Sequence, residues 1–195
     1  MLLSLDVGFK FMGYSIWHQG QVVDFDLIST IKSGRKGVLV THENIDRIKR
    51  LTDALTRLIL KNKIQGVIGE APHGGSQTAV AAREMATGLA VAVSVCQMLN
   101  VPDEWATPQM VKTAICGNPW GEKKEIMDRV ADIFGFNVTN KAISIEKGKR
   151  KGKTSIKTNY ELNGKSFPKT KFEHIADSFG AYLALKNYNL VKIYG

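Results

Sequence analysis

The sequence is poor in cysteine and carries fewer acidic than basic residues, and both shortages limit its function. Its 195 residues include two cysteines, Cys96 and Cys116, and both lie in apolar parts of predicted helices. We expect reduced core residues there, which argues against a disulfide framework or a cysteine-based metal site. With 18 acidic against 27 basic residues, the net charge of +9 indicates a polyanionic partner, most commonly nucleic acid. A generally basic, soluble surface is the other interpretation.

We also expect no apolar run that is long and uncharged enough to span a bilayer. The most apolar stretch, residues 88–99, follows Arg83 and Glu84 and looks too short to span a bilayer, so we expect no membrane partner. The opening residues 2–6 (LLSLD) lack the basic region and cleavage site of a signal peptide and predict a first strand. We therefore expect a cytoplasmic protein whose residues 1–195 form one domain without internal repeats.

The positive charge is concentrated in residues 141–171. This stretch holds ten basic and two acidic residues, which is +8 of the net +9. Such a block repels itself and is typical of a segment that anions order; with phosphate as the anion, binding is salt-sensitive. It shows no sustained periodicity, although Asn163-Gly164 indicates a hairpin within it. We interpret it as a basic insertion.

Hydrophobic periodicity predicts an α/β fold. Strands are predicted at 2–7, 13–18, 21–29, 65–70 and 105–106, and helices at 44–62, 77–99, 108–115, 122–134 and 172–185. The first three strands follow one another with short turns, which indicates an antiparallel meander. We predict a five-stranded mixed sheet with helices on both faces, the meander strands on one side and the last two strands on the other.

A few acidic residues stand where chemistry is expected. Asp6 and Glu70 each end an apolar strand, so their carboxylates would converge at one edge of the sheet. Asp177 lies on the last predicted helix, where apolar neighbours turn it inward, and His174 shares its face. Taken singly, each of these is typical of an ordinary turn, loop or surface residue; only the four together indicate a site.

Three carboxylates held together resist ionisation unless cations compensate their charge. Hard oxygen ligands select Mg²⁺ or Mn²⁺. Two such ions about 3.5–4 Å apart can hold the attacking and leaving oxygens of a phosphodiester displacement. Asp6, Glu70 and Asp177 are therefore the predicted ligands, and His174 is either a ligand of the second ion or the residue that positions water.

Four segments carry a resemblance to a known family. They are LSLDVG at 3–8, GVIGE at 66–70, HIAD at 174–177, and PQMVK at 108–112 followed by Gly117 and Glu122-Lys123. Together they resemble RuvC-type Holliday-junction resolvases of the RNase H-like superfamily, over residues 1–135 and 172–186. The resemblance implies an RNase H-like fold, a catalytic set of Asp6, Glu70, His174, Asp177 and Lys123, and two Mg²⁺ or Mn²⁺ ions per active site.

The resemblance also implies how DNA is bound and cut. A homodimer would present one active site to each of two equivalent strands of a four-way junction and leave 5′-phosphate and 3′-hydroxyl ends. The Ala- and Gly-rich helix at 77–99 would then be a contact between subunits, or else only core. The predicted DNA-binding residues are His73, Lys112, Lys123, Lys124, Lys149, Arg150, Lys151 and Lys153, although Lys112 and Lys123 also fit ordinary solvated helix lysines.

Two departures from the family pattern broaden the expectation. Family members often carry an aromatic residue just after the catalytic Glu, where this chain has Ala71-Pro72-His73. The long basic stretch is similar to the phage-type branch and favours a less selective branched-DNA or flap nuclease as the alternative. An inactive DNA-binding module is a third hypothesis. An actin-like ATPase shares Asp-x-Gly, but no adenosine-site glycine motif follows it.

Overall fold

The computed structural model describes residues 1–32, 34, 37, 39–72, 78–144 and 154–195. Its elements in chain order are β1 (Leu2–Asp6), β2 (Phe11–His18), β3 (Gln21–Ser29), α1 (Val40–Lys61), β4 (Gly66–Glu70), α2 (Ala79–Met98), β5 (Asp103–Ala106), α3 (Pro108–Cys116), α4 (Lys123–Phe134), β6 (Asn137–Ser144), β7 (Thr154–Leu162), β8 (Lys165–Pro168), α5 (Lys169–Ala184) and α6 (Asn189–Tyr194).

A five-stranded mixed sheet forms the centre of the molecule. Its strand order is β3-β2-β1-β4-β5, with β1, β2 and β3 antiparallel and β1, β4 and β5 parallel. The predicted meander lies on one side and the other two strands on the other, so the predicted sheet is confirmed. In this register Asp6 at the end of β1 is the direct neighbour of Glu70 at the end of β4.

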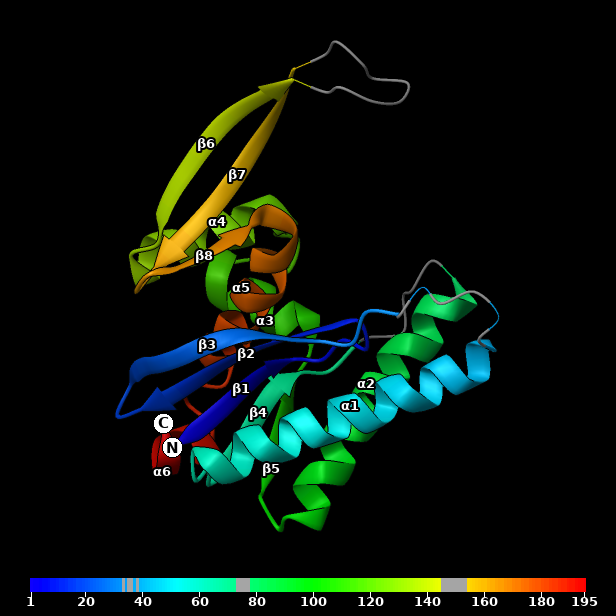
Figure 1. The fold of residues 1–195 in the computed structure, drawn as a ribbon. Helices are drawn as coiled ribbons and strands as arrows, with labels where there is room; N and C mark the ends of the chain where they lie inside the picture. The colour runs from blue at the N-terminus through cyan, green and yellow to red at the C-terminus, as the bar shows by residue number, and fades with distance from the viewer. Residues whose placement is uncertain (33, 35–36, 38, 73–77, 145–153) are drawn as a thin grey trace.

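Helices cover both faces of the sheet, as predicted (Figure 1). β1 has no solvent-exposed face because alternate residues point towards opposite sides of the sheet, and both sides are covered. Leu3 and Leu5 pack in the core with α1 and α2, whereas Leu2 belongs to the core that includes α3, α4 and α5. The hydroxyl of Ser4 also faces α5, where it donates to the carbonyl of Ser178 at 2.6 Å. This two-sided burial fixes the position of the strand that carries Asp6.

Helix α1 differs from its prediction at its N-terminal half. It begins at Val40, four residues before the predicted start, and Ile45 and Ile48 are exposed although they were expected on its apolar face. Arg47 occupies the buried position instead, with its guanidinium 3.9 Å from the centroid of the Phe9 ring. Arg47 is buried there because a backbone carbonyl, a carboxylate and an aromatic ring together replace its water.

Residues 141–144, 154–162 and 165–168 of the basic stretch form strands, although the sequence shows no sustained periodicity there. Strands β6 and β7 make a long antiparallel pair, here called the arm, which projects from the body beyond α5 (Figure 1). Its strand pattern escaped detection because neither face of its outer part is apolar. The predicted hairpin at Asn163-Gly164 is confirmed, with both residues at positive φ. At the base, Tyr160 stacks on Phe172 with the ring centroids 3.9 Å apart, which anchors the arm to α5.

Helix α2 is the most apolar element. Residues Ala79–Leu99 are long and apolar enough to cross a membrane by length and composition, so the expectation that no segment passes this test was wrong. One side of the helix nevertheless packs on the sheet, where Val91, Ala92 and Val95 are buried. Cys96 lies in the same core and, like Cys116, is a free thiol, as expected.

Candidate active site

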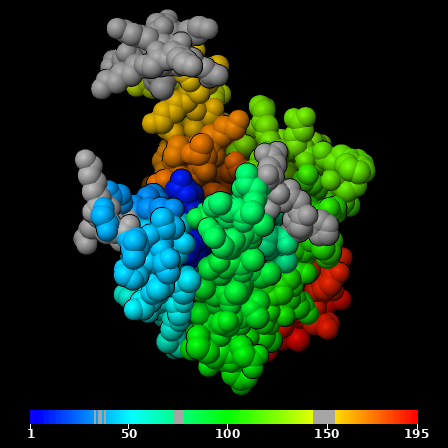
Figure 2. Space-filling model, turned by 90° about the vertical axis from the view of Figure 1, so that its right-hand side faces the viewer, coloured from blue at the N-terminus to red at the C-terminus, as the bar shows by residue number. Residues whose placement is uncertain are grey.

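A cavity of about 400 Å³ opens at the carboxyl end of β1 and β4. In Figure 2 the blue N-terminal residues lie in a recess between α1, α2 and the orange segment that begins α5, and the arm rises above them. All five predicted catalytic side chains, from four elements, line this cavity: Asp6, Glu70, Lys123, His174 and Asp177. The rest of its lining is Val7, Gly8, Met85, Pro108, Val111, Lys112, Ile126 and Glu173.

Two glycines bring these elements together. The chain turns sharply after β1, at Gly8. A Cβ at this position would collide with the backbone carbonyl of Phe11, so the turn requires glycine. Helix α5 crosses β2 so closely that a Cβ at Gly13 would collide with the carbonyl oxygen of His174. Gly13 is also the register partner of Asp6. The absence of a side chain at this position therefore lets α5 place His174 and Asp177 beside the strand that ends in Asp6.

The carboxylates interact strongly enough to disfavour ionisation. Burial, followed by the charge of Asp6, raises the pKa of Glu70 to about 8, although Lys112 and Lys123 partly offset both effects. Burial also raises the pKa of Asp177 well above its usual value, and the charges of Asp6 and Glu70 add to the effect. Acids on β1, β4 and α5 thus share one electrostatic environment, although they are far apart in the sequence.

His174 is joined to Asp6. Its Nδ1 lies 2.6 Å from Oδ2 of Asp6, and its ring is tilted against Phe11 with centroids 5.6 Å apart. Burial alone would lower the pKa of His174, but the hydrogen bond and the charges of Asp6 and Glu173 outweigh it and raise the pKa. The pair can therefore hold or release a proton at the mouth of the cavity.

Glu173 lines the cavity although sequence reasoning did not select it. It accepts a hydrogen bond from Nζ of Lys123, and this bond, opposed by partial burial, raises the pKa of the lysine. The signal was present in the sequence, because Glu173 precedes Asp177 by four residues and so shares its helix face. Lys123 therefore links α4 to α5 across the cavity.

The predicted DNA-binding residues are distributed over different parts of the chain. Lys112 and Lys123 lie at the cavity, on α3 and α4. Lys124 is exposed, does not line the cavity, and pairs with Asp128 on its own helix at 2.6 Å. The other predicted residues, His73, Lys149, Arg150, Lys151 and Lys153, lie outside the described residues.

The donor set suits a hard divalent cation, because it combines three carboxylates with one imidazole. The pKa values of Glu70 and Asp177 are raised because their ionised forms are disfavoured, and a bound cation would stabilise these ionised forms. As the side chains now lie, no group of three or more histidine, cysteine, aspartate or glutamate residues within the described ranges is gathered closely enough to hold a metal ion. Metal binding at this cavity would therefore require side-chain rotation, beginning with the Asp6–His174 pair.

No protein-family model and no curated protein matches the chain. Solved structures do match it. A structure of Thermus thermophilus RuvC and one of T. thermophilus RuvC in complex with a Holliday junction substrate each align with a TM-score of 0.60 at 14% identity. Each match covers 96% of this chain and 93% of the other. The chain has a RuvC-like fold. This agrees with the RNase H-like architecture expected from the sequence, and at this identity the likeness concerns the fold alone.

Proposed function

We propose that the protein is a Mg²⁺-dependent endonuclease that cuts four-way DNA junctions by paired, symmetric nicks. The observation that carries this is the cavity at the sheet edge, where burial and the charge of Asp6 raise the pKa values of both Glu70 and Asp177. An acidic cluster is costly for a fold to maintain, and divalent cations are the ligands that repay this cost. The RuvC-like fold and the net charge of +9 both favour a nucleic-acid substrate.

The side chains of the cavity have distinct roles in this proposal. Asp6, Glu70 and Asp177 would hold two divalent ions, and these ions would supply charge stabilisation for the attacking and leaving oxygens of a phosphodiester displacement. His174, whose Nδ1 is held by Asp6, receives or returns a proton at its other ring nitrogen, Nε2, or positions the water. Lys112 and Lys123 neutralise the phosphate, and Glu173 fixes the orientation of Lys123. The products would carry 5′-phosphate and 3′-hydroxyl ends.

A homodimer would bring two such cavities to one junction, and α2 is the proposed contact between subunits. Its outward face is apolar and small, with exposed residues at Ala82, Ala86, Ala90 and Val93. Spacings of three and four residues place these four on one stripe of the helix. Two α2 helices could therefore approach closely across a two-fold axis. Cytoplasmic location and membership of the phage-type branch remain predictions.

The central experiment is Asp6→Asn assayed on a synthetic four-way junction with Mg²⁺. The change keeps the size of the side chain but removes the charge that metal binding needs, so nicking should fall by about 100- to 1,000-fold or more. Junction binding measured in EDTA should persist. Asp132→Asn is the matched control, because Asp132 is exposed on α4 and does not line the cavity. Unchanged nicking by Asp6→Asn would refute the mechanism.

The breadth of the substrate is decided by comparing four-way, Y-shaped and linear DNA. A dedicated resolvase nicks the four-way junction fastest and in symmetric pairs. The arm favours the alternative of a broader branched-DNA or flap nuclease, because its exposed lysines would add sequence-independent contacts to phosphates. Equal rates on all three substrates would remove the resolvase assignment. Tight, salt-sensitive binding without any cleavage would instead indicate an inactive DNA-binding module.

A further inference from the structure

Trp120 is 85% exposed, the largest exposed fraction among the large hydrophobic residues of the described ranges. The other two tryptophans behave differently, because Trp17 is buried against Tyr182 and Trp105 is partly buried. An indole left in water gives up the stabilisation that its burial would provide. Folding therefore gains little from this side chain, and its exposed ring is available to contact another molecule.

The turn that carries Trp120 is tightly built. Gly117 ends α3 at positive φ, and its amide donates to the carbonyl of Thr113 at 2.9 Å. The side-chain oxygen of Asn118 accepts a hydrogen bond from the amide of Trp120 at 2.9 Å. On the other side, a Cβ at Gly121 would come within 2.6 Å of Sγ of Cys116. The indole is thus presented to solvent from a fixed turn.

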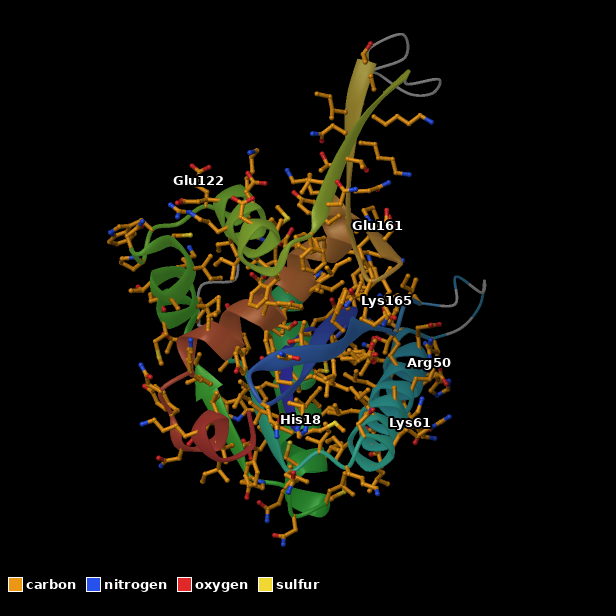
Figure 3. All side chains as sticks on the ribbon, turned by 90° about the vertical axis from the view of Figure 1, so that its left-hand side faces the viewer. His18, Arg50, Lys61, Glu122, Glu161 and Lys165 are labelled. Atoms are coloured by element: carbon orange, nitrogen blue, oxygen red, sulfur yellow. The ribbon has the colours of Figure 1, made fainter. Side chains whose placement is uncertain are left out.

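This turn lies close to the candidate active site. Trp120 precedes Lys123, which lines the cavity, by three residues, so their Cα atoms are at most about 11 Å apart. Three nucleotides of a DNA strand span a similar length, at roughly 3.4 Å each. Lys123 and Lys124 follow the turn, and the acidic Glu122 lies at the solvent-facing start of α4 (Figure 3). A strand whose phosphate enters the cavity is therefore long enough, over about three nucleotides, to reach Trp120.

We propose that Trp120 stacks on an unpaired DNA base at the branch point, within about three nucleotides of the phosphate that is cut. This rests on the proposed junction nuclease and adds a specificity-determining residue to it. An aromatic face binds any base, and it prefers an unpaired base because paired bases keep their faces inside the helix. Stacking there would make the enzyme select a branch over continuous duplex.

The test compares Trp120→Ala and Trp120→Phe with the wild type on a four-way junction that carries 2-aminopurine at the branch. Binding and fluorescence are read in EDTA, so the result does not depend on cleavage. Trp120→Ala should weaken junction binding by about 5- to 100-fold and abolish the fluorescence change on binding. Trp120→Phe should stay within about 3-fold of the wild type, and binding to linear duplex should be unchanged in all three proteins. Tyr188→Ala, at a half-exposed aromatic residue before α6, is the matched control.

Three results would overturn the stacking proposal. The first is equal junction binding and equal fluorescence for Trp120→Ala and the wild type. The second is an equal loss of linear-duplex binding, which would mean a general contact. The third is a wild type that sediments as a dimer and a Trp120→Ala variant that sediments as a monomer, which would mean that the indole contacts the other subunit. If the wild type fails to nick any junction yet shows the fluorescence change, the stacking proposal stands and the proposed nuclease activity fails.

Discussion

Charged residues in the body of the molecule and on the arm differ in their exposure to solvent and in their partners. In the body, Arg47 is almost completely buried and Asp177 is half-buried, and each interacts with specific partners. On the outer half of the arm, Lys141 and Lys157 are exposed and stand directly opposite each other across the strand pair. A buried charge depends on its partners, whereas an exposed lysine is solvated by water.

This difference separates two tasks. Buried charges in the body hold the cavity in shape and set its chemistry, so single substitutions there should have large effects. Charges on the arm can be added or removed at little cost to the fold, so they should adjust affinity in small steps. Substitutions that violate this division would show that the two regions are energetically coupled.

The largest effect on stability is expected at Arg47. Its Nε donates to the carbonyl of Thr30 at 2.7 Å, and it pairs with Glu84 at 2.9 Å. Arg47→Met leaves the buried carbonyl of Thr30 and the partly exposed carboxylate of Glu84 without this partner, so the free energy of unfolding should fall by about 3 kcal/mol. Arg57→Met is the control, because Arg57 is exposed and its pair with Asp53 is 3.8 Å long; it should cost less than about 0.5 kcal/mol.

Urea denaturation of the two variants measures this difference. Arg47 also touches Phe9, which lies three residues after Asp6, so its loss should reduce nicking at moderate temperature as well. Similar stabilities for the two variants would mean that the body tolerates loss of a buried charge as readily as loss of an exposed one. The contrast between buried and exposed charge would then be wrong for this molecule.

The second effect is a gain of stability at the cavity, at the expense of activity. The pKa of Glu70 is about 8 in the folded protein against 4.5 ordinarily, so unfolding between these pH values releases a proton. The stability supplied by the protonated carboxyl is thus complete below pH 4.5 and lost as the pH rises towards 8. Glu70→Gln removes this loss, so in EDTA at pH 8 it should be more stable than the wild type by about 1–3 kcal/mol.

Thermal unfolding in EDTA at pH 4 and pH 8 measures this gain. The wild type and Glu70→Gln should have similar Tm values at pH 4 and differ by several degrees at pH 8. Addition of Mg²⁺ at pH 8 should raise the Tm of the wild type more than that of the variant, because the cation replaces the proton. A Tm difference that does not change between the two pH values would mean that Glu70 does not titrate in this range.

The parts of the fold and the site that depend on local sequence pattern could be predicted from the sequence alone. Asp6 and Glu70 were predictable as neighbours because both end apolar strands, and parallel strands end at one edge. Strand β3 was predicted with its observed limits because the short Gln19-Gly20 turn precedes it and a polar loop follows it. Glu173 was overlooked, although its spacing from Asp177 placed it on the same helix face.

Other features could not be read from local pattern. The buried position of Arg47 depends on Thr30, Glu84 and Phe9, which lie on other elements. The outer part of β6 and β7 lacks the apolar alternation by which strands are recognised, because both of its faces are polar or exposed. The exposure of Trp120 was not predictable, because a tryptophan is ordinarily mostly buried. It depends on the conformation of the turn between α3 and α4.

The smallest effect is expected on the arm. Lys141→Gln with Lys157→Gln removes two positive charges that face each other at one register position. If each contacts one phosphate, junction binding at about 0.1 M salt should weaken by about 3- to 10-fold, and the slope of log K against log salt should become shallower by about 1–2. Relief of the like-charge pair should leave the fold equally stable or slightly more stable, by about 0.2–1 kcal/mol.

Lys49→Gln with Lys61→Gln is the matched control, because it removes the same charge from the exposed side of α1, where Lys61 lies at a distance from the arm (Figure 3). A loss of affinity that follows net charge alone would appear equally in both double variants. A loss confined to the arm variant, with the nicking rate at saturating junction unchanged, would mean that the arm contributes to binding and the cavity to chemistry. A fall in the saturated nicking rate of the arm variant would instead mean that the arm helps to position the strand in the cavity.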